Sequence, residues 1–212
     1  KLINNILLST SRMKSLLDGL LDLSKLHRKQ DNLNIEKLNP KEEVLYVLND
    51  PAIHEKIKNK NIQITIGTLK IRDLDGDRIR APSRGESQLY SLGVHNVDIH
   101  LNADKLLLSV CLSNIITNAI DFSSENNKIN ILIKQHSNDI AIEVIDEGKG
   151  LPPYLEDKIY DSFTSTERPD GTKSSGLGLS IVKTITDLHS GKVRISNRPM
   201  ETGVIAKLIF PK

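Results

Sequence analysis

Three short segments of this 212-residue chain carry residues whose types and spacing could do chemistry. In the first, SNIITNAIDF, Asn114, Asn118 and Asp121 recur at helical spacing, which places them on one stripe of a helix. Such a row of side-chain oxygens could bind a metal-bound polyphosphate, because Mg²⁺ prefers oxygen ligands. A solvent-facing polar stripe is the alternative interpretation.

The second segment, VIDEGKGLP, follows a predicted strand. Asp146 at the strand end could accept two hydrogen bonds, and Gly148 and Gly150 would let a flat ligand approach the backbone. A hairpin turn at DEG accounts for the same residues without a ligand.

The third segment, SSGLGLSIVK, has Gly176 and Gly178 directly before a helical pattern. Glycine is costly beside a helix unless the backbone needs unusual torsions or close approach to another group. A helix N-terminus presents unpaired N–H groups and attracts phosphate. A loop-to-helix junction that happens to use glycine is the alternative.

The elements that must position these residues follow from the hydrophobic period along the chain. A mixed α/β sandwich is expected, with an antiparallel-rich sheet on one side and helices on the other. The pattern predicts a long amphipathic helix over 1–28, a helix over 41–49, a strand over 61–67, an irregular segment over 72–97, a strand over 97–102, a helix over 103–122 capped by Asn102, strands over 128–135 and 139–148, a helix from Gly178 to about His189, and a hairpin of 192–197 and 203–210.

Composition excludes several classes of protein. A net charge of +2 gives no case for a nucleic-acid surface, and no run of apolar residues reaches the length of a membrane span. The single cysteine, Cys111, lies in an apolar segment and is expected to be a buried, inert thiol. Because Lys1 lies inside a periodic segment, we expect the chain to be a piece of a longer protein.

The order of these three segments, with the Phe-containing IYDSF between the second and the third, resembles the ATP-binding domain of sensor histidine kinases. SNIITNAIDFS is similar to the N box, DEGKG to the G1 box, IYDSF to the F box and SGLGLSIV to the G2 box. The resemblance implies an α+β fold for residues 33–212, a two-layer α/β sandwich of the Bergerat (GHKL) type shared with gyrase and the Hsp90 chaperones. Residues 1–32 resemble the second helix of the dimerisation hairpin plus a linker, and the segment after IYDS resembles the CreC-like branch of membrane-bound sensors.

The resemblance also implies roles for individual residues. Asp146 would bond the adenine amino group, with Gly148 and Gly150 shaping the adenine wall. Asn118 would coordinate Mg²⁺, and Asn114 would support the phosphates beside it.

A lid over residues 152–175 is implied as well. Its cations Arg168 and Lys173 are candidates for the γ-phosphate, although ordinary solubility of the lid explains them equally well. Side chains at the two glycines would collide with the triphosphate. The remaining implied nucleotide contacts are Phe163, Gly176, Leu177 and Gly178.

As implied function, the intact protein would use ATP and Mg²⁺ to phosphorylate a histidine, and the phosphate would pass to a response regulator receiver domain. It would be a homodimer through the hairpin helices and the cytoplasmic part of an inner-membrane sensor, with no nucleic-acid partner and with membrane contact only through other segments. A non-catalytic nucleotide-binding regulatory module and a GHKL-type ATPase or serine kinase are the alternative functions.

Two departures from the family pattern matter. Asp121 and Phe122 stand where the family commonly has a basic residue followed by Tyr, which would shift a phosphate contact to the lid. His27 and His54 lack the sequence context of the phosphoacceptor histidine, so we expect that histidine on a helix outside this chain and no self-phosphorylation. The histidines His95, His100, His136 and His189 lack zinc-ligand spacing.

Overall fold

A five-stranded sheet forms one layer of the computed structural model, which describes residues 33–70, 98–169, 171–172 and 174–212. The strands run in the order β2 (Gln63–Lys70), β4 (Lys128–Gln135), β5 (Asp139–Ile145), β7 (Val204–Pro211) and β6 (Lys192–Asn197). The β2–β4 pair is parallel, and the other three pairs are antiparallel. The predicted helix over 1–28, the segment 72–97 and Lys173 lie outside the described residues.

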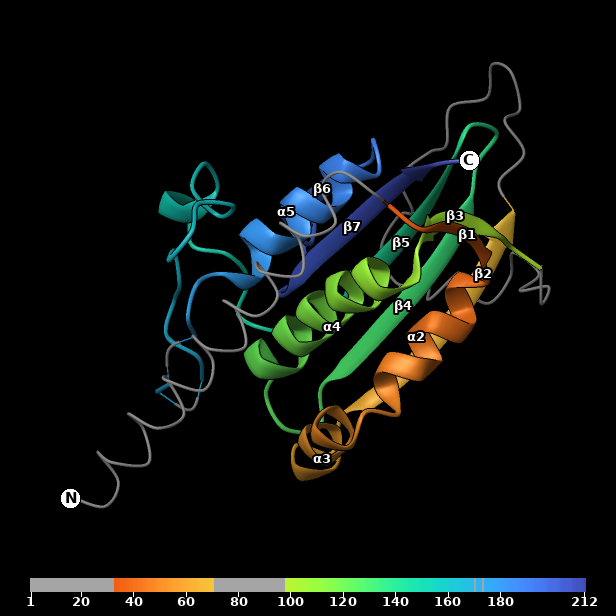
Figure 1. Cartoon of the computed structure of the whole chain (residues 1–212). Coiled ribbons are helices and arrows are strands. Elements are labelled where there is room, and N and C mark those ends of the chain that lie inside the picture. The colour runs from red at the N-terminus through yellow and green to blue at the C-terminus, as the bar shows by residue number, and fades with distance from the viewer. Residues whose placement is uncertain (1–32, 71–97, 170, 173) are drawn as a thin grey trace.

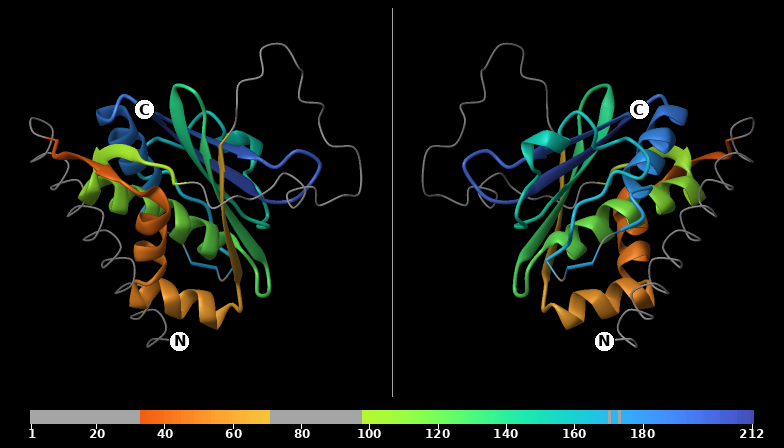
Figure 2. Two further views of the ribbon diagram at one scale, coloured as in Figure 1. Left: turned by 90° about the vertical axis from the view of Figure 1, so that its right-hand side faces the viewer. Right: turned by 90° about the vertical axis from the view of Figure 1, so that its left-hand side faces the viewer.

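Helices form the second layer. Three of them, α2 (Pro40–Leu48), α4 (Lys105–Phe122) and α5 (Gly178–Leu188), cover one face of the sheet (Figure 1). The two side views in Figure 2 show the helices on one side of the sheet. The predicted two-layer α/β sandwich is therefore confirmed, and the helix and strand predictions from residue 128 onward match the observed elements closely.

Periodicity explains how the two layers meet. Along β4, every second side chain faces the helices, and those of Ile129, Ile131 and Ile133 are fully buried there. Helix α4 is apolar over most of its surface because it packs against the sheet and against both α2 and α5. Cys111 is buried on this helix as predicted, and burial raises the pKa of its thiol far above the ordinary value.

The start of α4 corrects one prediction. Asn102 is not its N-cap, because β3 (Leu101–Asp104) pairs with β1 (Ile35–Leu38) and places Asn102 opposite Lys37. The cap is Asp104, whose Oδ1 accepts a hydrogen bond from the Leu107 N–H at 3.2 Å. By length and composition α4 is also apolar enough to cross a membrane, but here it is the central helix of the core.

Three elements were not predicted: helix α3, the short helix η2 and the strand β1 described above. Helix α3 (Pro51–Asn59) is capped by Asp50, is mostly polar and has only Ile53 buried. The short helix η2 (Pro153–Leu155) opens the segment between β5 and α5. The first of these elements braces the far end of α4, as described below.

Candidate functional site

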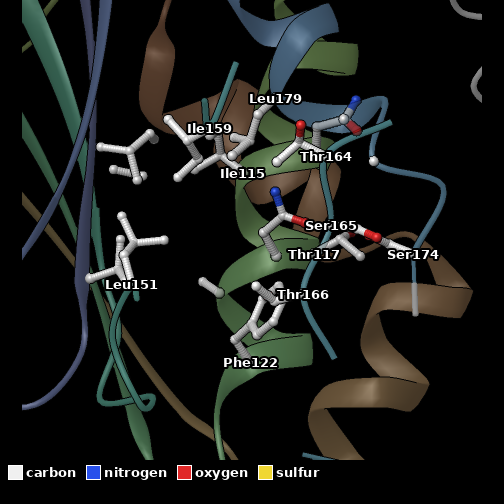
Figure 3. A pocket seen from close by; sticks show the side chains of 18 of the residues that line it. Ile115, Thr117, Phe122, Leu151, Ile159, Thr164, Ser165, Thr166, Ser174 and Leu179 are labelled. Atoms are coloured by element: carbon white, nitrogen blue, oxygen red, sulfur yellow. The ribbon is translucent and has the colours of Figure 1, made fainter. Parts of the chain in front are cut away.

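A cavity of about 330 Å³ opens beside α4, between the sheet, the start of α5 and the segment that links β5 to α5. Its volume falls in the range of about 300–1,000 Å³ that is typical of small-ligand sites. Figure 3 shows Ile115, Thr117 and Phe122 along α4, with Leu151 on one side of this helix and Ser174 on the other. Segments far apart in the sequence therefore meet around one cavity.

The polar stripe of α4 lines this cavity. Asn114 and Asn118 are both half-buried and both belong to the wall. The Asn114 amide donates to the Val110 carbonyl at 2.9 Å, so its Oδ1 is left to face the start of α5. Asp121 continues the stripe but is buried outside the cavity wall.

Asp146 lies at the end of β5 with only 6% of its surface exposed. Its Oδ1 accepts hydrogen bonds from the backbone N–H groups of Gly148 at 2.8 Å and Val204 at 3.2 Å. Burial raises the pKa of this carboxyl, and the two backbone N–H groups and the nearby Arg198 partly oppose that shift. Both recorded bonds end on Oδ1, which leaves Oδ2 to accept a hydrogen bond from a ligand.

The turn from β6 to β7 supports Asp146. The sequence analysis identified Asp146 but not the residues of this turn. Gly203 has a φ of +115°, and a Cβ there would lie 2.0 Å from the Asp146 carbonyl oxygen. Arg198 donates to the same carbonyl at 3.3 Å. No local signal connects these residues to Asp146, because the contact depends on the pairing of β5 with β7.

Contacts within the protein explain why several of these positions are glycine, because a Cβ there would be too close to neighbouring atoms. A Cβ at Gly148 would lie 2.7 Å from the Phe122 carbonyl oxygen, and one at Gly178 would lie 2.7 Å from Asn114 Oδ1. Gly176 has a φ of +72°, and a Cβ there would lie 2.5 Å from the Phe163 backbone. Gly150, Gly176 and Gly178 line the cavity, and Gly148 joins the β5 turn to the end of α4 behind it.

The segment 152–175 is the predicted lid, and only some of the residues predicted to contact the nucleotide in and after it line the cavity. Arg168 lines the cavity, whereas the Phe163 side chain is 70% exposed and lies outside the wall. Leu177 is buried in the core at the start of α5. Leu155 and Ile159 are buried and line the cavity, so the first part of this segment is packed against the domain.

The layered fold, the carboxylate at the end of β5 and the glycine junction before α5 define an ATP-binding domain of the GHKL type. The chain belongs to the histidine kinase-, DNA gyrase B- and HSP90-like ATPase family, whose pattern matches residues 103–212.

Named relatives are sensor histidine kinases. The chain is 28% identical over 205 residues to the sensor protein CreC of Escherichia coli K12, a match that covers 97% of this chain and 36% of that protein. The chain thus spans about a third of the length of this curated relative.

Solved structures agree with this assignment. The catalytic domain of the histidine kinase ThkA superposes with a TM-score of 0.62 at 27% identity, covering 84% of this chain and 98% of that domain. ThkA in complex with the response regulator protein TrrA matches with a TM-score of 0.67 at 27% identity, over all of this chain and 51% of that one. The described residues are therefore homologous to histidine kinase catalytic domains.

Proposed function

We propose that this chain binds ATP in the cavity beside α4 and serves as the catalytic domain of a sensor histidine kinase. The observation that carries the proposal is the meeting of Asp146, Asn118 and the Gly176–Gly178 junction around one cavity of suitable size. A buried acceptor for a base and a helix start for phosphates are the two contacts that a nucleotide needs.

Asp146 would hold the adenine. Its Oδ2 is suited to accept a hydrogen bond from the exocyclic amino group, while Oδ1 is kept in place by two backbone N–H groups. Apolar side chains from the sheet and lid, including Ile159 and Val204, would pack against the base.

Asn118 would carry the metal contact. Among the described residues there is no group of three or more His, Cys, Asp or Glu that could hold an ion. One amide oxygen together with phosphate oxygens and water suits Mg²⁺, which commonly keeps several waters and binds through substrate phosphates. Bound Mg²⁺ would neutralise phosphate charge during transfer, and Asn118 and Asn114 would hold the phosphate end on α4.

The acceptor and partners follow from the relatives. We propose that the γ-phosphate passes to a histidine on a hairpin helix and then to a response regulator, since ThkA was solved in complex with one. Dimerisation through residues 1–32, and a cytoplasmic position as part of a membrane-bound sensor, belong to the same proposal and concern residues or segments that the structure does not describe.

Calorimetric titration with ATP, with and without Mg²⁺, tests the proposal. We expect binding, and Asp146→Asn should weaken it, because the amide would leave a mispaired buried group at a cost of about 1–3 kcal/mol. This corresponds to roughly a 5- to 150-fold loss of affinity.

Glu125→Gln is the matched control, since it removes one negative charge from an exposed side chain in the turn after α4. Equal affinity of the wild type and Asp146→Asn for ATP would contradict the assignment of Asp146. Absence of any binding by the wild type would contradict the function itself.

A further inference from the structure

Asp121 is a buried carboxylate that joins three elements at the C-terminal end of α4. Its Oδ1 accepts a hydrogen bond from Lys56 Nζ of α3 at 2.8 Å. Its Oδ2 lies 2.7 Å from Arg168 Nη2 of the segment between β5 and α5, which is an ion pair without hydrogen-bond geometry. Only 8% of the Asp121 side chain is exposed, so these two cations take the place of water around it.

The end of α4 that carries Asp121 is firmly held. Lys60 Nζ donates to three carbonyl oxygens there, those of Ile120, Asp121 and Ser123, at 2.9 to 3.0 Å. A cation at a helix C-terminus satisfies unpaired carbonyls and complements the helix dipole. Asp121 is therefore a fixed anchor for Arg168, which arrives on an irregular segment.

Arg168 keeps donors for a ligand. Among the described residues that line the cavity, Arg168 is the sole cation and Asp146 the sole acid. The contact with Asp121 uses Nη2, and Arg168 Nε is buried with no hydrogen-bond partner in the described part of the chain. A guanidinium has five N–H donors, and the ion pair with Asp121 uses none of them in a hydrogen bond, so they are left for phosphate oxygens.

The net charge around Arg168 also favours phosphate binding. Lys56 already pairs with the Asp121 carboxylate, so the three groups together carry one net positive charge. A cation that lines the cavity and retains excess positive charge attracts a polyphosphate, whereas an Arg neutralised by a private carboxylate would not.

We infer that Asp121 is a positioning residue that holds Arg168 at the phosphate end of the cavity, so that the lid supplies the cation which α4 lacks. This inference rests on the proposed ATP binding. It gives a specific role to the acidic residue that stands where the family pattern commonly has a base.

The experiment compares ATP and adenosine binding by calorimetry in the wild type, Arg168→Gln, Asp121→Asn and the double variant. We expect Arg168→Gln to weaken ATP roughly tenfold or more and to leave adenosine unchanged, because a charge-assisted contact to phosphate is lost. Asp121→Asn should weaken ATP several-fold, and the double variant should lose no more than Arg168→Gln, since Asp121 acts through Arg168.

Two further variants isolate the mechanism. Lys56→Gln leaves Asp121 paired with Arg168 alone, so by the charge argument above it should weaken ATP binding and leave adenosine binding unchanged. Arg194→Gln is the control, because it removes a positive charge from an exposed side chain on β6 and should have no effect on either ligand. If Asp121→Asn does not fold, Asp121→Ser removes the same carboxylate with a smaller side chain and carries the same expectation.

Four results would overturn the inference, and a fifth would overturn the function on which it rests. Tighter ATP binding by Asp121→Asn would mean that Asp121 withholds Arg168 from phosphate. Additive losses in the double variant, or an equal loss of adenosine, would mean that the two residues act separately or structurally. A wild type that binds no ATP contradicts the proposed function, whereas a wild type that binds ATP as tightly as Arg168→Gln contradicts this inference only.

Discussion

At the scale of single residues, the site depends on polar side chains in which one atom is hydrogen-bonded within the protein and another is left for a ligand. Asp146 has one oxygen occupied by backbone N–H groups and the other available. Asn114 is similar, because its amide nitrogen donates to the Val110 carbonyl and its oxygen is left toward α5. Holding one atom of each group fixes the direction of the other, which lowers the entropy that a ligand must overcome to bind.

Acidification should weaken adenosine binding through Asp146. Burial raises the pKa of this carboxyl, so it protonates at a higher pH than an ordinary Asp and then no longer offers two acceptor oxygens. Affinity should be full above the raised pKa and should fall as the pH drops through it, in adenosine titrations that step downward from neutral pH. The contribution of Asp146 to the free energy of unfolding changes in the opposite sense. Because burying the ionised carboxylate destabilises the folded state, this contribution becomes more favourable as the pH falls through the raised pKa.

Asp146→Asn is the control for this experiment, because it lacks the titrating group and should show no change assignable to position 146. A wild-type affinity that stays constant over the same range, with adenosine used so that no phosphate titrates, would contradict an ionised Asp146 as the acceptor.

At the scale of elements, helix α3 is joined to helix α4 by two lysines as well as by the buried Ile53. Lys56 and Lys60 are one helical turn apart, at the end of α3 and at its C-cap. One pairs with the Asp121 side chain, and the other with the carbonyls at the end of the same helix. This connection keeps the end of α4 in place beside the cavity.

Lys60→Met should lower the free energy of unfolding by about 1–2 kcal/mol, because three carbonyls lose their shared donor and the helix dipole loses its cation. Chemical denaturation measures the change. Lys58→Met on the same helix is the matched control, since the Lys58 side chain is exposed, and it should change stability by less than about 0.5 kcal/mol. Equal losses in the two variants would show that the cap contributes nothing.

At the scale of the whole molecule, the fold brings the proposed ATP contacts from separate parts of the sequence to one cavity, and no histidine is among the described residues that line it. Of the chain's six histidines, none stands in the acceptor context described above. His189 is buried in the core, where its Nε2 accepts from the Asp104 N–H at 3.0 Å and its ring packs against Phe210. It is a structural residue that pins the start of α4 to the end of α5.

Incubation with ATP labelled at the γ-phosphate should therefore leave no acid-labile label on this chain by itself, although the chain binds ATP. Transfer requires near in-line approach of a nucleophile to the γ-phosphate, and no histidine lines the described cavity. Label that appears on the chain and is lost in His54→Ala would contradict the expectation. Rapid release of free labelled phosphate would favour an ATPase over a histidine kinase.

The sequence by itself determined the local features of this protein. Periodic apolar residues predicted α4, β4, β5, α5 and the final hairpin, because side-chain burial repeats with the period of each element. The polar stripe of Asn114 and Asn118 and the DEG turn were identified as candidates for the same reason, since each lies within a few residues. Helix α3 was missed because its burial signal is a single residue, Ile53.

Only the tertiary structure decided how distant residues meet. The cap of α4 moved from Asn102 to Asp104 because strand pairing with β1 extends β3 to that residue. The tight environment of Gly176 comes from the Phe163 backbone, and the ion pair of Asp121 with Arg168 comes from the path of the segment between β5 and α5. Such contacts join groups that local periodicity does not relate, so they exist only once the chain has folded around its shared core.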